Sequence, residues 1–302
     1  MMITMKYHNP VLLKETVDGL NIIKNGVYVD VTFGGGGHSK EILSRLGSEG
    51  KLFAFDQDKD ALLNKIDDDR FVLINENFRH IKRFLRFHGV KSVNGILADF
   101  GVSSHQFDVP DRGFSTRFEA DLDMRMNQED TLSAFNVVND YEEEQLRQVF
   151  WQYGELRQAP LLARTIVAER KNEEIKTTEQ LKQVIKRYLP PRRENKILAQ
   201  IYQAIRIEVN QEIEVLKAFL EQTSELLVSE GRLSVISYHS LEDRLVKRYM
   251  RSGMFEGEPE KDVYGNVSVP YKKIGKLIVP TQEEIDVNNR ARSAKLRIAE
   301  RI

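Results

Sequence analysis

Four consecutive glycines, Gly34 to Gly37, follow a short apolar segment and precede a histidine and a serine in "VYVDVTFGGGGHS", residues 27–39. Glycines between a strand and a helix let the backbone approach a ligand closely, while the helix N-terminus offers free N–H groups. Gly34, Gly36 and Ser39 fit the pattern G-x-G-x-x-[G/S], a weak signal when it stands alone. No lysine precedes the serine, which argues against the phosphate-binding loop of nucleoside-triphosphate hydrolases.

Acidic residues accompany this loop. Asp56 ends the next predicted strand, 20 residues after Gly36, where a carboxylate can accept hydrogen bonds from ribose hydroxyls. Asp30, four residues before the first glycine, favours S-adenosylmethionine over NAD, because an acid there can help hold the charged methionine moiety. A solvated strand-end acid is the alternative for Asp30. Phe78 is placed to cover an adenine face, with a core position as its alternative. We therefore expect an adenosine-containing ligand.

Two further strand ends are rich in polar side chains, "ADFGVSSHQ" at 98–106 and "SYHSLEDR" at 237–244. Ligands of doubly wound sheets lie at the carboxyl ends of the strands, so we expect both segments to face the reacting group. Turn and cap chemistry of serine, aspartate and glycine is the alternative explanation.

The elements that must position these residues alternate in type. Strands are predicted at the apolar segments 27–30, 51–56, 70–75 and 93–101, with helical patterns between them. This alternation predicts an α/β fold with a doubly wound, mostly parallel sheet.

The alternation stops after the fourth strand. Residues 109–209 show helical patterning, including a helix that Thr177 and Gln180 open as a capping box and that Pro190-Pro191 close. A strand returns within 230–243, and 253–280 is predicted to be a long surface loop or hairpin. We therefore predict a methyltransferase-type α/β domain over 1–108 and 210–302, interrupted by an all-helical domain over 109–209.

Composition excludes several classes of chemistry. The 302-residue chain has 41% hydrophobic residues, enough for a core, and no cysteine, which excludes disulfides, thiolate metal sites and cysteine nucleophiles. With no apolar leader and no membrane-length apolar segment, we expect a cytoplasmic protein without a membrane partner. The net charge of −1 neither suggests nor excludes a polyanionic partner.

Six further segments stand out along the chain: "YHNPVLLKE", "RGFS", "DMRM", "IYQAIRIEVNQE", "GRLSVISYHSLEDRLVKR" and "NNRARSAKLRIAER". Together with the segments quoted above, they resemble the successive signatures of the RsmH (MraW) methyltransferases over nearly the whole chain. The resemblance implies a class I (Rossmann-like) methyltransferase domain with an inserted helical substrate-recognition domain. It also implies methyl transfer from S-adenosylmethionine to the exocyclic N4 amino group of a cytosine in the decoding region of 16S ribosomal RNA. The family's cofactor contacts would fall on Gly36, Gly37, His38, Asp56, Phe78, Asp99 and Gln106.

Three positions depart from the family pattern. The segment "ENKILAQIYQAIRI" replaces an expected "HPA" element, His105 stands where proline is common, and Tyr238 stands where phenylalanine is common.

Without cysteine, methylation of a pyrimidine ring carbon is disfavoured, and attack by an exocyclic amine or a hydroxyl remains. A cytosine amino group is a poor nucleophile, so the site must align it with the methyl group and accept its hydrogen bond. Asp99 is our candidate acceptor; His239, Glu242 and Asp243 are the others, and no catalytic residue is assigned.

RNA binding requires cations. The segment 182–196 carries six basic residues, Lys182, Lys186, Arg187, Arg192, Arg193 and Lys196, and the C-terminal motif adds Arg290, Arg292, Lys295 and Arg297. Such clusters neutralise phosphates, although a solvated helix face is the alternative for the first. Arg112 and Arg125, just after the fourth predicted strand, are predicted to line the active-site cleft. Since base pairing buries the amino edge of cytosine, the target is expected to be single-stranded or flipped out.

Three other functions stay open: a methyltransferase for a small molecule or protein, a non-enzymatic ribosome-assembly factor, and an NAD-dependent oxidoreductase. The first predicts a neutral enclosed pocket, the second loss of the glycine loop or Asp56, and the third nicotinamide-dependent turnover. No metal-ligand spacing is recognisable. A homodimer is conceivable, but no residue pattern supports it.

Overall fold

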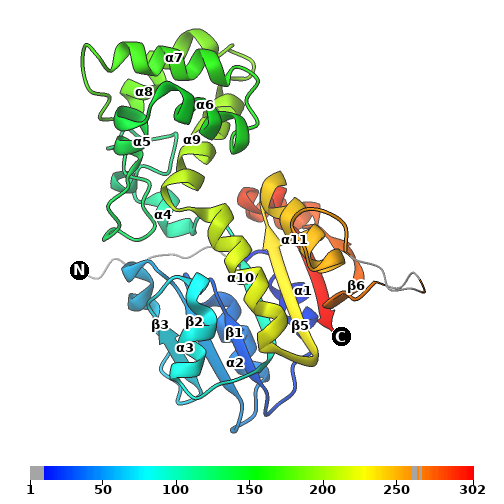
Figure 1. Ribbon diagram of the computed structural model, residues 1–302. Helices are drawn as coiled ribbons and strands as arrows, with labels where there is room; N and C mark the ends of the chain where they lie inside the picture. Colours follow the sequence, from blue (N-terminus) through cyan, green and yellow to red (C-terminus); the bar gives the residue numbers. More distant parts are fainter. Residues whose placement is uncertain (1–9, 260–263, 265–266) are drawn as a thin grey trace. The chain divides into compact units, whose positions relative to one another are not determined.

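The computed structural model describes residues 10–259, 264 and 267–302, which form two compact units (Figure 1). The α/β unit comprises the chain up to Gly101 and from Ile213 onward, and the helical unit comprises Val102–Glu212. The predicted boundaries at 108/109 and 209/210 lie a few residues away from these. Val102 and Phe107 pack against the helical core, and the Asn210 side chain bonds to the Met124 carbonyl, so both junction segments belong to the helical unit.

The α/β unit contains a seven-stranded sheet in the order β3-β2-β1-β4-β5-β7-β6. Strands β1 to β5 are parallel, and β7 runs antiparallel to both β5 and β6. The bounds are β1 Val27–Asp30, β2 Lys51–Phe55, β3 Phe71–Ile74, β4 Val93–Asp99, β5 Leu227–Ser237, β6 Tyr271–Ile278 and β7 Lys295–Arg301. The prediction of an α/β fold with a mostly parallel sheet is confirmed.

Alternate residues of the central strands point to opposite faces of this sheet, as strand geometry requires. Val29 and Phe53 join one apolar cluster, while Tyr28 and Leu52 join another. Both faces are therefore covered by helices, which explains why these strands are almost continuously apolar. The helices of this unit are α1 Leu13–Gly19, α2 Gly37–Arg45, α3 Ile81–Phe87, α10 Glu212–Leu226, α11 Ser240–Ser252 and α12 Gln282–Val287.

The helical unit has its own apolar core, in which Phe150, Leu162 and Ile201 are fully buried. Its helices are α4 Ser104–Asp108, α5 Ala134–Asp140, α6 Glu143–Gln152, α7 Ala159–Glu169, α8 Thr178–Ile185 and α9 Glu194–Val209. The predicted capping box of Thr177 and Gln180 opens α8. Helix α8 ends at Ile185 and passes into a 3₁₀ turn, Lys186–Tyr188, before the prolines. No strand forms among the described residues 102–212, as predicted.

The C-terminal part contains two strands that were not predicted. Residues 253–280, the predicted loop or hairpin, contain the edge strand β6, and residues 260–263 and 265–266 of that segment lie outside the described residues. Residues 7–9 of the motif "YHNPVLLKE" also lie outside them. The motif "NNRARSAKLRIAER" forms a 3₁₀ turn, Asn289–Ser293, followed by β7, a strand inside the sheet. Among the described residues, no helix has the length and apolar character needed to cross a membrane.

Candidate cofactor-binding site

The glycine loop leaves bare backbone at the start of α2. Gly34 and Gly36 have positive φ values of 51° and 75°, which favour glycine, and Gly36 caps α2 without any side-chain hydrogen bond. A Cβ at Gly37 would lie 2.1 Å from Pro10 Cγ, and one at Gly36 would lie 2.9 Å from the Phe33 ring. Because the first N–H groups of a helix lack intrahelical partners, this start of α2 suits an anionic or polar ligand group.

Asp56, just beyond β2, ties the loop to the sheet. One carboxylate oxygen accepts from the Gly34 N–H at 2.8 Å, and the other accepts from the Asp58 N–H at 2.9 Å. Burial raises the pKa of Asp56 to about 6, although these two hydrogen bonds oppose the shift. The carboxylate is therefore ionised at neutral pH and keeps further lone pairs that can accept hydroxyl hydrogen bonds. The predicted ribose contact stays a prediction.

Asp30, the last residue of β1, is enclosed beneath the glycine loop. Its side chain is 0% exposed and accepts from the Ser39 hydroxyl at 2.7 Å and from the Thr32 N–H at 3.1 Å. Burial raises its pKa to about 6. An acid closed off in this way holds the loop to α2 from inside, so the interpretation of Asp30 as a solvated strand-end acid is wrong. Its help in holding the charged methionine moiety stays a prediction.

Asp99 ends β4 and is surrounded by polar groups from three segments. Its carboxylate accepts from the Tyr238 hydroxyl at 2.8 Å and lies 3.8 Å from His38 Nδ1, while its N–H donates to Thr32 Oγ1 at 2.7 Å. Strand pairing sets Asp99 opposite Ile236 of β5, which explains why residues just past β5 reach it. Burial raises the pKa of Asp99 to about 6. The Tyr238 hydroxyl is the contact that the sequence motifs did not point to.

Phe78 and Gln106 complete the predicted cofactor set. Phe78 is half-buried and packs its ring against Phe100 and Phe219, with centroid separations of 5.9 and 5.3 Å. Gln106 belongs to the helical unit, where it is buried and forms a capping box with Ser103 at the start of α4. Each therefore has a packing or capping role, and the cofactor contacts of both stay predictions.

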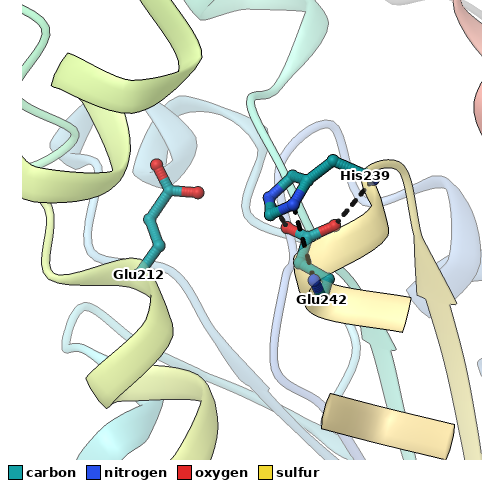
Figure 2. A group of neighbouring side chains, drawn as sticks. All are labelled: Glu212, His239 and Glu242. Atoms are coloured by element: carbon teal, nitrogen blue, oxygen red, sulfur yellow. Dashed lines mark hydrogen bonds and ion pairs between the residues drawn. The ribbon is translucent and has the colours of Figure 1, made fainter. Parts of the chain in front are cut away.

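The start of α11 holds two of the candidate acceptors in mutual contact. Figure 2 shows His239 and Glu242, whose Nε2 and Oε1 atoms lie 3.0 Å apart. Glu242 also accepts from the Tyr238 N–H at 2.9 Å, and His239 Nδ1 accepts from the Glu242 N–H at 3.4 Å. These contacts form a reciprocal helix cap, so the pair joins the end of β5 to α11. Glu212, also drawn, is the last residue of the helical unit and the first of α10, and it accepts from the Arg206 guanidinium at 2.7 Å.

Asp243 of α11 pairs with basic residues of β7. It accepts from Arg297 Nε at 2.8 Å and lies 3.5 Å from Lys295 Nζ. Burial alone would raise the pKa of Asp243, but the hydrogen bond and charge of Arg297 outweigh it and lower this pKa. Asp243 is thus a weak base, and Arg297 neutralises a carboxylate of its own chain. The predicted phosphate role of Lys295 and Arg297 is not supported by this pairing.

Arg112 and Arg125 are structural residues of the helical unit. Arg112 is 3% exposed and donates to the carbonyls of Arg125 and Met126, both at 3.0 Å. Arg125 forms two hydrogen bonds with the Asp123 carboxylate, at 2.9 and 2.8 Å. The prediction that both line a substrate cleft is wrong for Arg112, because a buried guanidinium bonded to carbonyls cannot reach a ligand.

The basic segment 182–196 remains largely on the surface. Lys182 and Arg187 have acidic neighbours, Glu194 at 3.0 Å and Glu169 at 3.7 Å. The exposed cations of this segment are Lys186, Arg187, Arg192, Arg193 and Lys196. Five exposed cations within 11 residues can face a polyanion.

The sheet order, with an antiparallel β7 between β5 and β6, a glycine loop after β1 and an acid after β2, defines a Rossmann-like methyltransferase fold. The chain matches the MraW methylase family over residues 5–302 and belongs to that family.

Individual relatives are similar over their full length. The ribosomal RNA small subunit methyltransferase H of Flavobacterium johnsoniae is 73% identical over 299 residues, which cover 99% of either chain. The protein of the same name from Christiangramia forsetii is 72% identical over 302 residues, covering both chains completely. That of Cytophaga hutchinsonii is 55% identical and covers 98% of this chain and 99% of its own.

Proposed function

We propose that this protein transfers a methyl group from S-adenosylmethionine to small-subunit ribosomal RNA, at the exocyclic N4 amino group of a cytosine in the decoding region. The observation that carries the proposal is the glycine backbone at the start of α2, which follows β1. Asp56 and Asp99 lie at the ends of β2 and β4, the strands on either side of β1. Its support is the alignment, from end to end, with relatives whose names state methylation of this RNA.

In this proposal, each site residue contacts the part of the cofactor that suits its chemistry. The backbone of Gly36, Gly37 and His38 offers N–H groups to polar atoms, and Asp56 offers carboxylate oxygens to ribose hydroxyls. Asp99 offers a carboxylate at the end of β4, and Phe78 and Gln106 complete the set that the family resemblance implies. Bound S-adenosylmethionine supplies a sulfonium whose methyl group is electrophilic.

The proposed transfer leaves one proton to remove. An amino nitrogen that received the methyl group of the sulfonium would carry one proton more than the neutral product, and a nearby carboxylate would have to help remove it. Asp99, whose pKa burial raises to about 6, is ionised at neutral pH and can accept a hydrogen bond from that amino group. It suits this role better than Glu242 or Asp243, because those carboxylates are tied to a helix cap and to Arg297.

RNA is held by charge in this proposal. The exposed cations between Lys186 and Lys196 contact phosphates, so binding weakens as salt rises. The target cytosine is unpaired or flipped out, because pairing hides its amino group. Since the substrate is ribosomal RNA, we propose that the protein acts in the cytoplasm on RNA within the small subunit.

The test is methyl transfer from labelled S-adenosylmethionine to small subunits purified from cells that lack this protein, followed by nucleoside analysis. We expect label in N4-methylcytidine, and no label with Asp56→Ala at limiting cofactor. Label in another nucleoside would correct the position of the methyl group. Absence of label from RNA, with cofactor binding intact, would overturn the RNA substrate and favour a small-molecule or protein substrate.

A further inference from the structure

The hydroxyl of Tyr238 and the carboxylate of Asp99 meet where β5 and β4 end. The pairing of Asp99 with Ile236 places residue 238 just past the sheet, and the hydroxyl donates to Asp99 Oδ1 at 2.8 Å. The ring lies next to Gly101, where a Cβ would make an ordinary van der Waals contact 3.4 Å from Tyr238 Cδ2. The ring thus lies beside the chain that leaves β4, with its polar end on the carboxylate.

The second oxygen of Asp99 faces His38, which cannot replace this donor. His38 Nε2 lies 3.2 Å from the Val11 carbonyl, which only accepts, so Nε2 carries the ring proton. Burial lowers the pKa of His38, so at neutral pH its Nδ1 presents a lone pair to Asp99 Oδ2, 3.8 Å away. Tyr238 is therefore the side-chain hydrogen-bond donor to this carboxylate within the described part of the chain.

Burial and the acidic neighbours of Asp99 are unfavourable to its ionised form. Burial raises the pKa of Asp99, as do the charges of Asp30 and Glu242, whereas the charge of His38, when it is protonated, and the Tyr238 hydrogen bond lower it. Burial raises the pKa of the Tyr238 phenol, and the charges of Asp99, Glu242 and Glu284 raise it further, so Tyr238 stays a donor.

We propose that Tyr238 is a positioning residue that holds the Asp99 carboxylate ionised and in a single orientation for binding S-adenosylmethionine. This inference rests on the proposed function, in which Asp99 contacts the cofactor. The hydroxyl fixes Oδ1, which leaves the remaining lone pairs of Asp99 at one place beside the start of α2. A phenylalanine at this position preserves the ring and its packing but leaves the carboxylate without its donor.

Cofactor affinity as a function of pH tests the proposal without any RNA. S-adenosylmethionine binding to the full chain is measured by calorimetry at pH 6 and pH 8 for the unmodified protein and for Tyr238→Phe. Loss of the hydroxyl is expected to raise the Asp99 pKa by about one, so Kd rises about fivefold at pH 6 and stays nearly unchanged at pH 8. Tyr249→Phe is the matched control, because the Tyr249 hydroxyl lies 3.3 Å from Ser224 Oγ instead.

A second measurement asks whether the effect passes through Asp99. In an Asp99→Asn background, which removes the titrating group, Tyr238→Phe is expected to add no further pH dependence. Asp30, Asp56 and His38 are present in both members of this pair of variants, so their titration contributes to both binding curves.

The outcomes separate the two proposals. Equal weakening by Tyr238→Phe at both pH values would reduce the hydroxyl to a packing role, and an unchanged Kd at pH 6 would remove it from the site. Additional pH dependence in the Asp99→Asn background would also overturn the inference. Failure of the unmodified protein to bind S-adenosylmethionine would instead overturn the proposed function itself.

Discussion

The carboxyl edge of the sheet and the helical unit use charged side chains in opposite ways. At the sheet edge, Asp56 and Asp99 retain partial exposure beside a bare backbone turn, with the Asp99 side chain 20% exposed. In the helical unit, Arg112 is buried and Arg125 bonds to Asp123 and to backbone carbonyls. A parallel sheet leaves the ends of its strands as a place for ligands, whereas charged side chains between helices satisfy the loops that join them.

The largest effect that tests this contrast is expected at the glycine loop. In Gly37→Ala the new Cβ would lie 2.1 Å from Pro10 Cγ, and if the overpacking of about 1–3 kcal/mol falls on the bound state, S-adenosylmethionine binding weakens about 5- to 150-fold. Calorimetry measures the change. Gly275→Ala is the control for backbone strain alone, since its φ is 64° and a Cβ there meets no atom within 4 Å. Unchanged cofactor affinity in Gly37→Ala would separate the loop from the binding site.

In the helical unit, Arg112→Met should cost stability instead of ligand affinity. Loss of the guanidinium leaves the buried carbonyl groups of Arg125 and Met126 without these donors, at about 2–4 kcal/mol. Trp151 is the single tryptophan and lies in α6, so its fluorescence during urea unfolding reports on this unit.

Arg164→Met, on the exposed side of α7, is the matched control and should change stability by less than about 0.5 kcal/mol. If Arg112→Met weakened RNA binding and left the unfolding curve unchanged, Arg112 would return to the list of ligand contacts.

Asp30 differs from the other acids at the sheet edge, because it is fully buried. Its pKa is raised from 3.8 to about 6 by burial, so the native state binds a proton more tightly than the unfolded state does. Stability from this group is present below about pH 4 and is lost as pH rises through 6, by up to about 3 kcal/mol. Asp30→Asn should therefore flatten the dependence of unfolding free energy on pH between 4 and 6.5.

Asp68 is the control for that experiment, because its pKa is lowered where that of Asp30 is raised. Its hydrogen bonds with Arg70 lower its pKa to about 2, so Asp68→Asn should leave the slope between pH 4 and 6.5 unchanged. An unchanged slope in Asp30→Asn would mean that the Asp30 carboxylate is not buried in solution.

The smallest effect is expected for the exposed cations. Arg192→Gln with Arg193→Gln should weaken RNA binding about tenfold at low salt and reduce the slope of log affinity against log salt by about 1 to 2. Lys171→Gln removes an exposed cation of the same unit outside segment 182–196. Filter binding over a salt series distinguishes the two, and an equal effect of Lys171→Gln would indicate a diffuse charge effect without a defined surface.

Much of the α/β unit was predictable from local pattern. Apolar segments separated by helical periods predicted the parallel strands, and the spacing from Gly36 to Asp56 predicted a loop and an acid at adjacent strand ends. The capping box at Thr177 was also predictable, because it depends only on neighbours in sequence. The basic motif at the C-terminus was not predictable as a strand inside the sheet, since its apolar positions are interleaved with cations, of which Lys295 and Arg297 pair with Asp243 of α11.

The sequence by itself determined the order of the elements, the glycine-rich turn and the supply of carboxylates at the strand ends, because these depend on short-range periodicity and on residue type. Tertiary structure alone decided which charges are available. It enclosed Asp30, bound Asp243 to Arg297, buried Arg112 and brought the Tyr238 hydroxyl to Asp99 across 139 residues of sequence. Burial and partner choice depend on which segments pack together, and no local pattern contains that information.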